Sequence, residues 1–241
     1  MKLILDIGNT ATKAAIFSQK ELINEIRLEE LNLSDIESFV GANKITSSII
    51  SCVNNEKKEI INEVSKIYNS FLFTYKSQIP INSLYSTPET LGLDRVAGVV
   101  GASILFPGKD ILVFDLGTCL TIDYIDSKKQ YYGGRISPGI KMRYDALHHF
   151  TNQLPKLSYT ENLDLLGTDT NSSIHSGIQR GFMNEISSTI SYYKKENPDI
   201  IVVVTGGDSF FLDREFKSGI FVDPFLVLKG LNEILDYNEN R

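Results

Sequence analysis

Several side chains that can do chemistry crowd into one short phrase near the start of the sequence, D-I-G-N-T-A-T-K, which begins at Asp6. Gly8 lets the backbone turn tightly and lets a ligand approach the amides. Asn9 and Thr10 offer donors to phosphate oxygens, and Lys13 adds a positive charge. The carboxylate of Asp6 is suited to binding magnesium, directly or through water. The phrase is neither a P-loop nor a dinucleotide fingerprint, and an ordinary hairpin turn is the alternative interpretation.

A related phrase, D-L-G-T-C-L-T-I-D, begins at Asp115 and ends at Asp123. Asp115 lies 109 positions after the first aspartate (115 minus 6), close to half of the 241-residue chain. Two acidic turns at equivalent places, facing one cleft, would clamp a metal–polyphosphate. A third phrase, T-G-G-D, follows a buried strand, and its Gly206 and Gly207 leave room for a flat ring or a ribose against the backbone. Alone this last pattern is weak, since paired glycines often just end a strand.

The segment between the two acidic turns, Y-S-T-P-E-T-L-G-L-D-R, ends with Asp94 and Arg95. Such a pair is usually a solvated surface ion pair. Here the pair stands between the two acidic turns, where a substrate that accepts a phosphoryl group would have to lie. Phosphoryl transfer demands positioning and charge neutralisation more than a strong base, so that an aspartate suffices as the proton acceptor.

The elements that must position these residues follow from apolar periodicity and turn signals. The second acidic phrase lies in a strand–turn–strand at 110–126, and 131–139 is expected to be a glycine-rich turn. The other predicted strands are 2–7, 11–17, 21–28, 45–53 and the apolar part of 199–212. The predicted helices are 34–40 with Ser34 as N-cap and Glu37 at the capping-box position, 55–68, 94–106, 170–197 and 223–235. The recurrence predicts two related subdomains, 1–107 and 108–241, each opening with a hairpin that carries an Asp and a Gly.

Composition narrows the range of partners. The chain is 42% hydrophobic and 22% charged, with a net charge of −6 and no basic block. This argues against nucleic acid and against an anionic membrane surface. No stretch approaches the roughly 20 apolar residues of a membrane span, and the N-terminal apolar run is too short for a signal peptide. Two cysteines indicate a reducing compartment, hence the cytoplasm.

Three histidines show no metal spacing, and we expect no catalytic role for them. Gly177 and Gly181 form a small-residue face on the long predicted helix. Close helix packing inside the core is the simpler interpretation of this face, and a dimer contact is the alternative.

Taken together, the motifs resemble the type III pantothenate kinases, members of the acetate-kinase, sugar-kinase, Hsp70 and actin superfamily. They run in the family's order over nearly the full length. The matching motifs are D-I-G-N-T-A-T-K, Y-x-x-P-x-x-L-G-x-D-R, D-L-G-T-x-x-T-x-D, G-G-x-I-x-P-G, A-L-H, L-P, G-T-D-T, S-G, T-G-G-D and D-P-F-L-V-L-K-G-L.

The resemblance implies an α/β fold with two related actin-like (ribonuclease H-like) subdomains, each a mixed sheet with helices. It implies the first step of coenzyme A biosynthesis, in which ATP phosphorylates the primary hydroxyl of pantothenate to give 4'-phosphopantothenate. It also implies a homodimer with each pantothenate site near the dimer interface. The implied cofactors are Mg²⁺ and a monovalent cation, K⁺ or NH₄⁺.

The family's roles carry over position by position. Asp94 is then the proton acceptor, Asp115 binds the monovalent cation, and Asp6 holds Mg²⁺ through phosphate or water. The ATP-binding positions are Asp6, Ile7, Gly8, Asn9, Thr10, Ala11, Thr12, Lys13 and Thr118, with Gly206 and Gly207 on the adenosine side. The pantothenate positions are Tyr85, Gly92, Leu93, Asp94, Arg95 and Thr170, and Arg95 is expected to pair with the substrate's carboxylate.

The sequence departs from the family pattern at two positions: Asp169 stands where Asn is usual, and Cys119 where Ala is usual. The first departure bears on the shape of the pantothenate pocket, whereas the second is a small residue replacing another. Two rival functions remain at this point: a non-catalytic regulatory protein on the same scaffold, and a kinase or phosphatase for another small substrate. The enzyme is favoured because its key residues are intact: Asp6, Lys13, Asp94 and Asp115.

Overall fold

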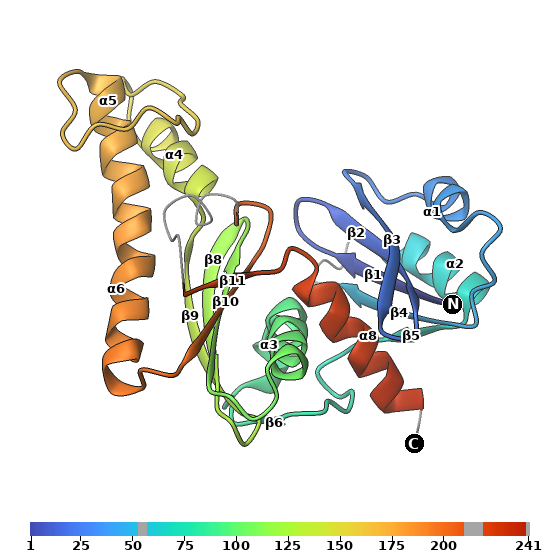
Figure 1. Cartoon of the computed structure of the whole chain (residues 1–241). Coiled ribbons are helices and arrows are strands. Elements are labelled where there is room, and N and C mark those ends of the chain that lie inside the picture. Colours follow the sequence, from blue (N-terminus) through green and yellow to red (C-terminus); the bar gives the residue numbers. More distant parts are fainter. Residues whose placement is uncertain (53–56, 210–218, 240–241) are drawn as a thin grey trace.

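The computed structural model describes residues 1–52, 57–209 and 219–239. Two mixed β-sheets lie on either side of a central pair of helices, and further helices cover their outer faces (Figure 1). The architecture is therefore α/β, as the sequence predicts.

The first sheet has the strand order β3-β2-β1-β4-β5. Leu3 and Leu5 of β1 face the helices of the outer side, whereas Ile4 packs into the core between the sheets. Such alternation buries both faces, and each fully buried Leu or Ile contributes about 1.5–3 kcal/mol. The strands are β1 Lys2–Ile7, β2 Thr12–Ser18, β3 Glu21–Leu28, β4 Ser47–Cys52 and β5 Ser70–Leu72, and the outer helices are α1 Leu33–Val40 and α2 Lys58–Tyr68.

The second sheet has the order β11-β10-β7-β8-β9-β6. Its strands are β6 Asn82–Ser83, β7 Ile111–Leu116, β8 Cys119–Ile125, β9 Gln130–Pro138, β10 Ile201–Thr205 and β11 Phe221–Val222. The run β9-β8-β7-β10-β11 repeats β3-β2-β1-β4-β5, because each hairpin is antiparallel and β10 is parallel to β7 as β4 is to β1. This confirms the predicted duplication. The outer face carries α4 Ile140–His149, α5 Thr170–His175, a π-helical turn Ser176–Arg180 and α6 Gly181–Glu196.

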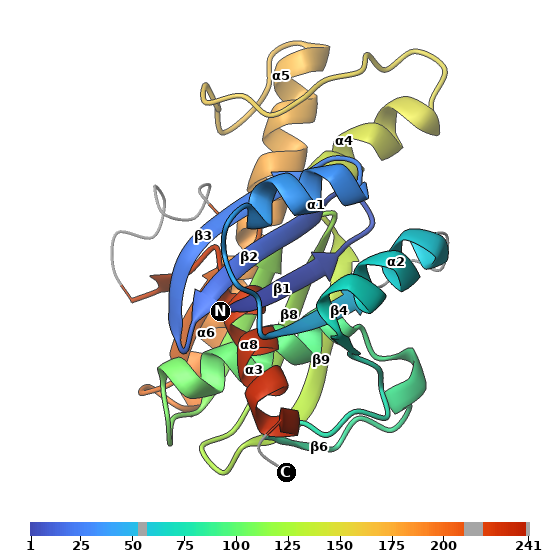
Figure 2. The same ribbon diagram turned by 90° about the vertical axis from the view of Figure 1, so that its right-hand side faces the viewer.

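Two glycine-bearing helices, α3 Leu93–Leu105 and α8 Leu226–Glu239, cross closely between the sheets (Figure 2). A methyl group built on Gly230 would lie 1.8 Å from the carbonyl oxygen of Ala97, and one on Gly101 would lie 2.4 Å from that of Leu226. Larger residues would force the helices apart. The small residues that the sequence places in α3 thus have a packing reason.

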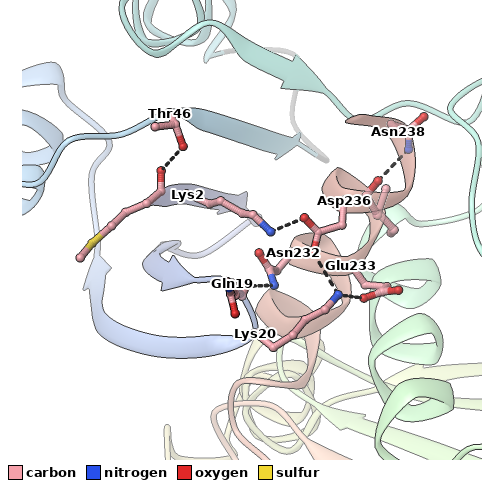
Figure 3. A network of polar contacts seen from close by, with 10 residues as sticks. Lys2, Gln19, Lys20, Thr46, Asn232, Glu233, Asp236 and Asn238 are labelled. Atoms are coloured by element: carbon pink, nitrogen blue, oxygen red, sulfur yellow. Dashed lines mark hydrogen bonds and ion pairs between the residues drawn. The ribbon is translucent and has the colours of Figure 1, made fainter. Parts of the chain in front are cut away.

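Helix α8 also binds the first sheet through polar contacts (Figure 3). Lys2 forms an ion pair with Asp236, Lys20 with Glu233, and Asn232 Nδ2 donates to the carbonyl oxygen of Gln19 at 2.9 Å. The C-terminal helix therefore joins the two halves of the chain. The subdomain boundary between residues 107 and 108 stays a prediction.

Four expectations about local structure are wrong. The N-cap of α1 is Asn32, not Ser34, because the Asn32 side chain accepts from the backbone N–H of Asp35 at 2.9 Å. Residues 131–139 form strand β9 rather than a turn, since they pair antiparallel with β8. The long helix is interrupted by the π-helical turn. Gly177 and Gly181 do not pack inside the core, because a methyl group on either would meet nothing within 4 Å.

Among the described helices, none has both the length and the apolar character that crossing a bilayer requires.

Candidate active site

The two acidic turns meet at one point between the halves of the molecule. The hydroxyl oxygens of Thr10 and Thr118 lie 2.9 Å apart, within hydrogen-bonding distance. Each turn is closed by its own glycine N–H, which donates to Ala11 in the first turn (3.1 Å) and to Cys119 in the second (3.0 Å). The repeated motif thus produces two hairpin tips that touch across the cleft.

A cavity of about 530 Å³ opens along these tips and collects most of the predicted phosphate and metal residues. The predicted residues that line it are Asp6, Gly8, Asn9, Thr10, Ala11, Lys13, Asp94, Asp115, Thr118, Gly206 and Gly207. Ile7 and Thr12 are fully buried in their strands and do not line it. The cavity also includes residues to which the sequence analysis gave no site role. Arg27, Lys141, Met142 and Asp145 lie outside the motifs, whereas Gly117, Cys119, Thr121 and Asp208 lie within them.

The second turn is packed closely between two glycines, Gly139 and Gly206. A methyl group on Gly139 would lie 2.2 Å from the carbonyl oxygen of Gly117. Gly206 has φ +96°, and a methyl group there would lie 2.3 Å from the Leu116 carbonyl oxygen and 2.4 Å from Oδ1 of Asp115. Only glycine fits such contacts. The glycine after β10 therefore fixes the second turn as well as bordering the cavity.

The carboxyl groups of Asp6 and Asp115 are buried in this cavity and lie near other carboxylates. Burial, reinforced by Asp94 and Asp115, raises the pKa of Asp6 to about 7, although Lys13 opposes the shift. Burial and neighbouring carboxylates likewise raise the pKa of Asp115 to about 6, again against the effect of Lys13. Such shifts are typical of functional sites. The cavity would bind additional cations favourably.

Asp94 lies in the first turn of α3 and points into the same cavity. Its Oδ1 accepts from the backbone N–H of Arg95 at 2.9 Å. A methyl group on Gly92 would lie 2.5 Å from that oxygen, so glycine leaves room for the carboxylate to fold back over the helix start. Gly92 acts on this site by positioning Asp94.

Arg95 does not form a solvated surface pair, so that interpretation is wrong. Its side chain is buried and makes a two-pronged ion pair with Asp123, with Nε and Nη2 donating at 3.0 and 2.6 Å. The hydroxyl of Tyr131 donates to the same carboxylate at 2.7 Å. The charge of Asp123 is thus satisfied locally. The donors of Arg95 that this pair leaves over are the Nη1 hydrogens and the second hydrogen of Nη2. Their pairing with a substrate carboxylate stays a prediction.

The other predicted pantothenate residues lie outside the cavity. Tyr85 stacks on Tyr131 with ring centroids 6.5 Å apart, and Leu93 belongs to the core between the sheets. Helices α4 and α5 and the loop between them, residues 140–175, project from the second sheet as an arm (Figure 1). Thr170 starts α5 at the far end of this arm, where it lines a separate cavity of about 1070 Å³. Its neighbour Asp169 is the N-cap of α5 and accepts from the Ser172 N–H at 3.0 Å. Asn caps helices as well as Asp does, so this departure from the family preserves a structural role.

Within the described ranges, no group of three or more His, Cys, Asp or Glu side chains lies together as a ready metal site. One atom nevertheless fits a cation. Oδ1 of Asp6 is buried and has no hydrogen-bond partner in the described part of the chain. A buried carboxylate oxygen is costly unless it is paired, so a bound cation or its water would satisfy it.

Solved structures agree with this architecture. A protein of Campylobacter jejuni described as a conserved Baf family transcriptional activator superimposes with a TM-score of 0.67 at 24% identity, covering 99% of this chain and 100% of that chain. ADP-bound MreB5 of Spiroplasma citri superimposes with a TM-score of 0.50 at 14% identity, covering 100% and 98% of the two chains. These likenesses concern the fold. They confirm duplicated actin-like subdomains.

The fold thus defines an actin-like α/β protein with an acidic cavity between its two halves. A sequence model of the family described as type III pantothenate kinase matches residues 2–192. A type III pantothenate kinase of Phocaeicola vulgatus is 42% identical over 240 residues, which covers 99% of this chain and 99% of the relative. The chain belongs to the type III pantothenate kinase family, and it is a kinase.

Proposed function

We propose that this chain transfers the terminal phosphoryl group of ATP to the primary hydroxyl of pantothenate, giving 4'-phosphopantothenate in the first step of coenzyme A biosynthesis. The observation that carries the proposal is the convergence of Asp94, Lys13 and the two acidic turns on one cavity. This is the set of groups that phosphoryl transfer needs: a proton acceptor beside an anion-binding, cation-demanding cleft.

The phosphates of ATP would lie along the hairpin tips. The amides around Gly8 and Gly117, the Thr10 and Thr118 hydroxyls and the Lys13 ammonium are the donors there. Gly206 and Gly207 also line the cavity, and without side chains they would let a ribose and a flat base approach the backbone. Preorganised donors of this kind provide much of the rate enhancement in phosphoryl transfer.

Two cations complete the proposal. Asp6, with its unpartnered buried oxygen, would hold Mg²⁺ through phosphate or water, and Asp115 would hold a monovalent cation, K⁺ or NH₄⁺. When bound, these ions neutralise the charge of the phosphates and carboxylates. Burial, and then the neighbouring carboxylates, raise the pKa of both carboxyls, so their ionised forms are costly in the protein alone.

Asp94 would take the proton. The pantothenate hydroxyl oxygen forms a bond to the γ-phosphorus, the bond between that phosphorus and the β–γ bridging oxygen breaks, and ADP leaves. The hydroxyl proton passes to the Asp94 carboxylate. Held by Gly92 and the Arg95 N–H, the carboxylate is fixed at the start of a rigid helix.

We also propose a homodimer, in the cytoplasm. Thr170 lies on α5, away from the cavity that holds Asp94, so a single chain does not bring the predicted substrate residues together. The arm that carries Thr170 exposes large apolar side chains: Phe150 is 82% exposed, Leu165 71% and Leu166 79%. A second copy would cover them and offer its Thr170 to the first copy's site. Light scattering at micromolar concentration should show two chains per particle, and a monomer would contradict this assembly.

The decisive test compares Asp94→Asn with Glu89→Gln, a change in an exposed side chain of the same segment. General-base assistance is worth roughly 10²–10⁴ in rate, so Asp94→Asn should lose about that factor in kcat while the Kd for ATP is nearly kept. Glu89→Gln should behave as wild type. If Asp94→Asn keeps more than about a tenth of the wild-type rate, Asp94 is not the base. Offering acetate and sugars beside pantothenate tests the substrate, and a wild-type protein that phosphorylates none of them would be non-catalytic.

A further inference from the structure

An arginine that the motifs do not mark completes a charged row across the first sheet. Pairing across β1, β2 and β3 places Asp6 opposite Lys13, and Lys13 opposite Arg27. Directly opposed residues project from the same face of a sheet. All three line the cavity between the halves. The row therefore presents one carboxylate and two cations to the same space.

Lys13 and Arg27 are directly opposed on neighbouring strands, with no anion between them. Like charges directly opposite one another destabilise a sheet. Neither Lys13 nor Arg27 makes a hydrogen bond or ion pair within the described part of the chain, and the Arg27 side chain is exposed. An anion that binds both would convert this repulsion into attraction.

Arg27 also reaches across the cleft. A methyl group built on Gly207 would lie 3.5 Å from Nη1 of Arg27, although Gly207 belongs to the other half of the molecule. The same guanidinium opposes the burial that raises the pKa of Asp208. Arg27 thus lies beside Lys13 and within reach of the turn after β10, so its guanidinium faces the space in which Lys13 would bind phosphates.

We propose that Arg27 binds the polyphosphate of the nucleotide, beside Lys13, and determines the preference for ATP over nucleotides with fewer phosphates. The inference rests on the proposed function, in that ATP occupies this cavity. A planar guanidinium matches phosphate oxygens with two parallel donors, which the ammonium of Lys13 does not provide. Arg27 would contact the phosphates and leave the adenine to other residues.

The test is calorimetric binding of ATP, ADP and AMP, each with Mg²⁺, to the full chain and to Arg27→Gln, Arg27→Lys and Arg135→Gln. Arg135 is an exposed arginine of β9, the strand of the second sheet that corresponds to β3. Arg27→Gln should weaken ATP binding about ten- to a hundredfold, the worth of a charge-assisted hydrogen bond. It should weaken ADP binding less and leave AMP binding unchanged. Arg27→Lys should recover part of the loss, and Arg135→Gln should match wild type.

The remaining outcomes separate the two proposals. Wild-type Kd values for ATP in Arg27→Gln, or an equal loss for ATP and AMP, would overturn the role of Arg27. A wild-type chain that binds no ATP would overturn the proposed function itself. The thermal midpoint without ligand adds a second readout: because a like-charge contact is removed, Arg27→Gln should melt no lower than wild type, and a lower midpoint would show that Arg27 is structural.

Discussion

The two halves of the molecule present the same hairpin with different charges. In the first half, the row across the sheet reads Asp6, Lys13, Arg27. In the second half, the corresponding row reads Asp115, Thr121, Ile136. The carboxylate is repeated, but both of its cationic companions are absent from the second row. Ile136 is 62% exposed and does not line the cavity.

Because of this difference, the two hairpins have the same shape but are suited to binding different ions. The first row carries its own cations and is suited to holding an anion. The second row offers a carboxylate beside a hydroxyl, oxygen ligands of the kind that hard cations prefer. Lys13 has to serve both carboxylates, because its charge lowers the pKa of Asp6 and of Asp115 alike. The two halves thus share the frame of the site, and the missing cations of the second row are the reason why we propose that this half takes an added ion.

The largest expected effect comes from neutralising the two carboxylates separately. Asp6→Asn should lose at least about 10²-fold in kcat at every salt composition, because it removes the group that we propose holds the metal and the phosphates. Asp115→Asn should lose roughly tenfold, and its rate should no longer respond to K⁺ or NH₄⁺. Steady-state rates in potassium, ammonium and sodium buffers check both. Equal losses with equal ion responses would show that the two rows do not differ in task.

A smaller effect is expected from giving the second row the cation of the first. Thr121→Lys places an ammonium opposite Asp115, as Lys13 stands opposite Asp6. The variant should work in potassium-free buffer within roughly tenfold of the potassium-activated wild type. Thr121→Met, similar in length but uncharged, is the matched control and should stay inactive without potassium. An inactive Thr121→Lys that binds ATP normally would mean that the site needs the geometry of an ion and not just its charge.

Local sequence patterns predicted most of the frame of this site but not its charge balance. The repeated Asp-x-Gly phrases indicated both hairpins and their meeting in one cleft, because a strand–turn–strand has a short-range signature. The ion pair of Arg95 with Asp123 lies 28 positions apart and has no such signature. The same holds for Arg27, which becomes a neighbour of Lys13 only through strand register. The paired glycines at 133 and 134 suggested a turn, because Gly-Gly is a local turn signal. The structure instead uses them for close packing against Tyr85 and β8, a tertiary contact that the local sequence does not reveal.

The smallest expected effect is on the free energy of unfolding. It compares the cost of the buried carboxylate in each row, Asp6 and Asp115, in the absence of any ligand. The pKa of Asp6, about 7, and that of Asp115, about 6, both lie above the ordinary value of 3.8, so the folded state binds these protons more tightly than the unfolded chain. The free energy of unfolding should therefore fall as the pH rises from about 4 to 7 and stay low above it. Asp6→Asn removes the larger shift. In metal-free, nucleotide-free buffer at pH 8 it should be at least about 1 kcal/mol more stable than wild type, since one pKa unit is worth about 1.4 kcal/mol. Asp115→Asn should gain less.

Urea unfolding at pH 5 and pH 8 measures this ranking. Asp169→Asn serves as the control, because the Ser172 N–H lowers the pKa of Asp169. The contribution of Asp169 to the free energy of unfolding therefore has the opposite sign: it is present when the pH is above the ordinary pKa of an aspartate and is lost as the pH falls. Adding Mg²⁺ and ATP should remove most of the wild-type pH dependence, since the bound cations favour the ionised carboxylates. A variant Asp6→Asn that is less stable than wild type at pH 8 would mean that Asp6 is already neutralised within the protein, and the contrast between the rows would then rest on Asp115 alone.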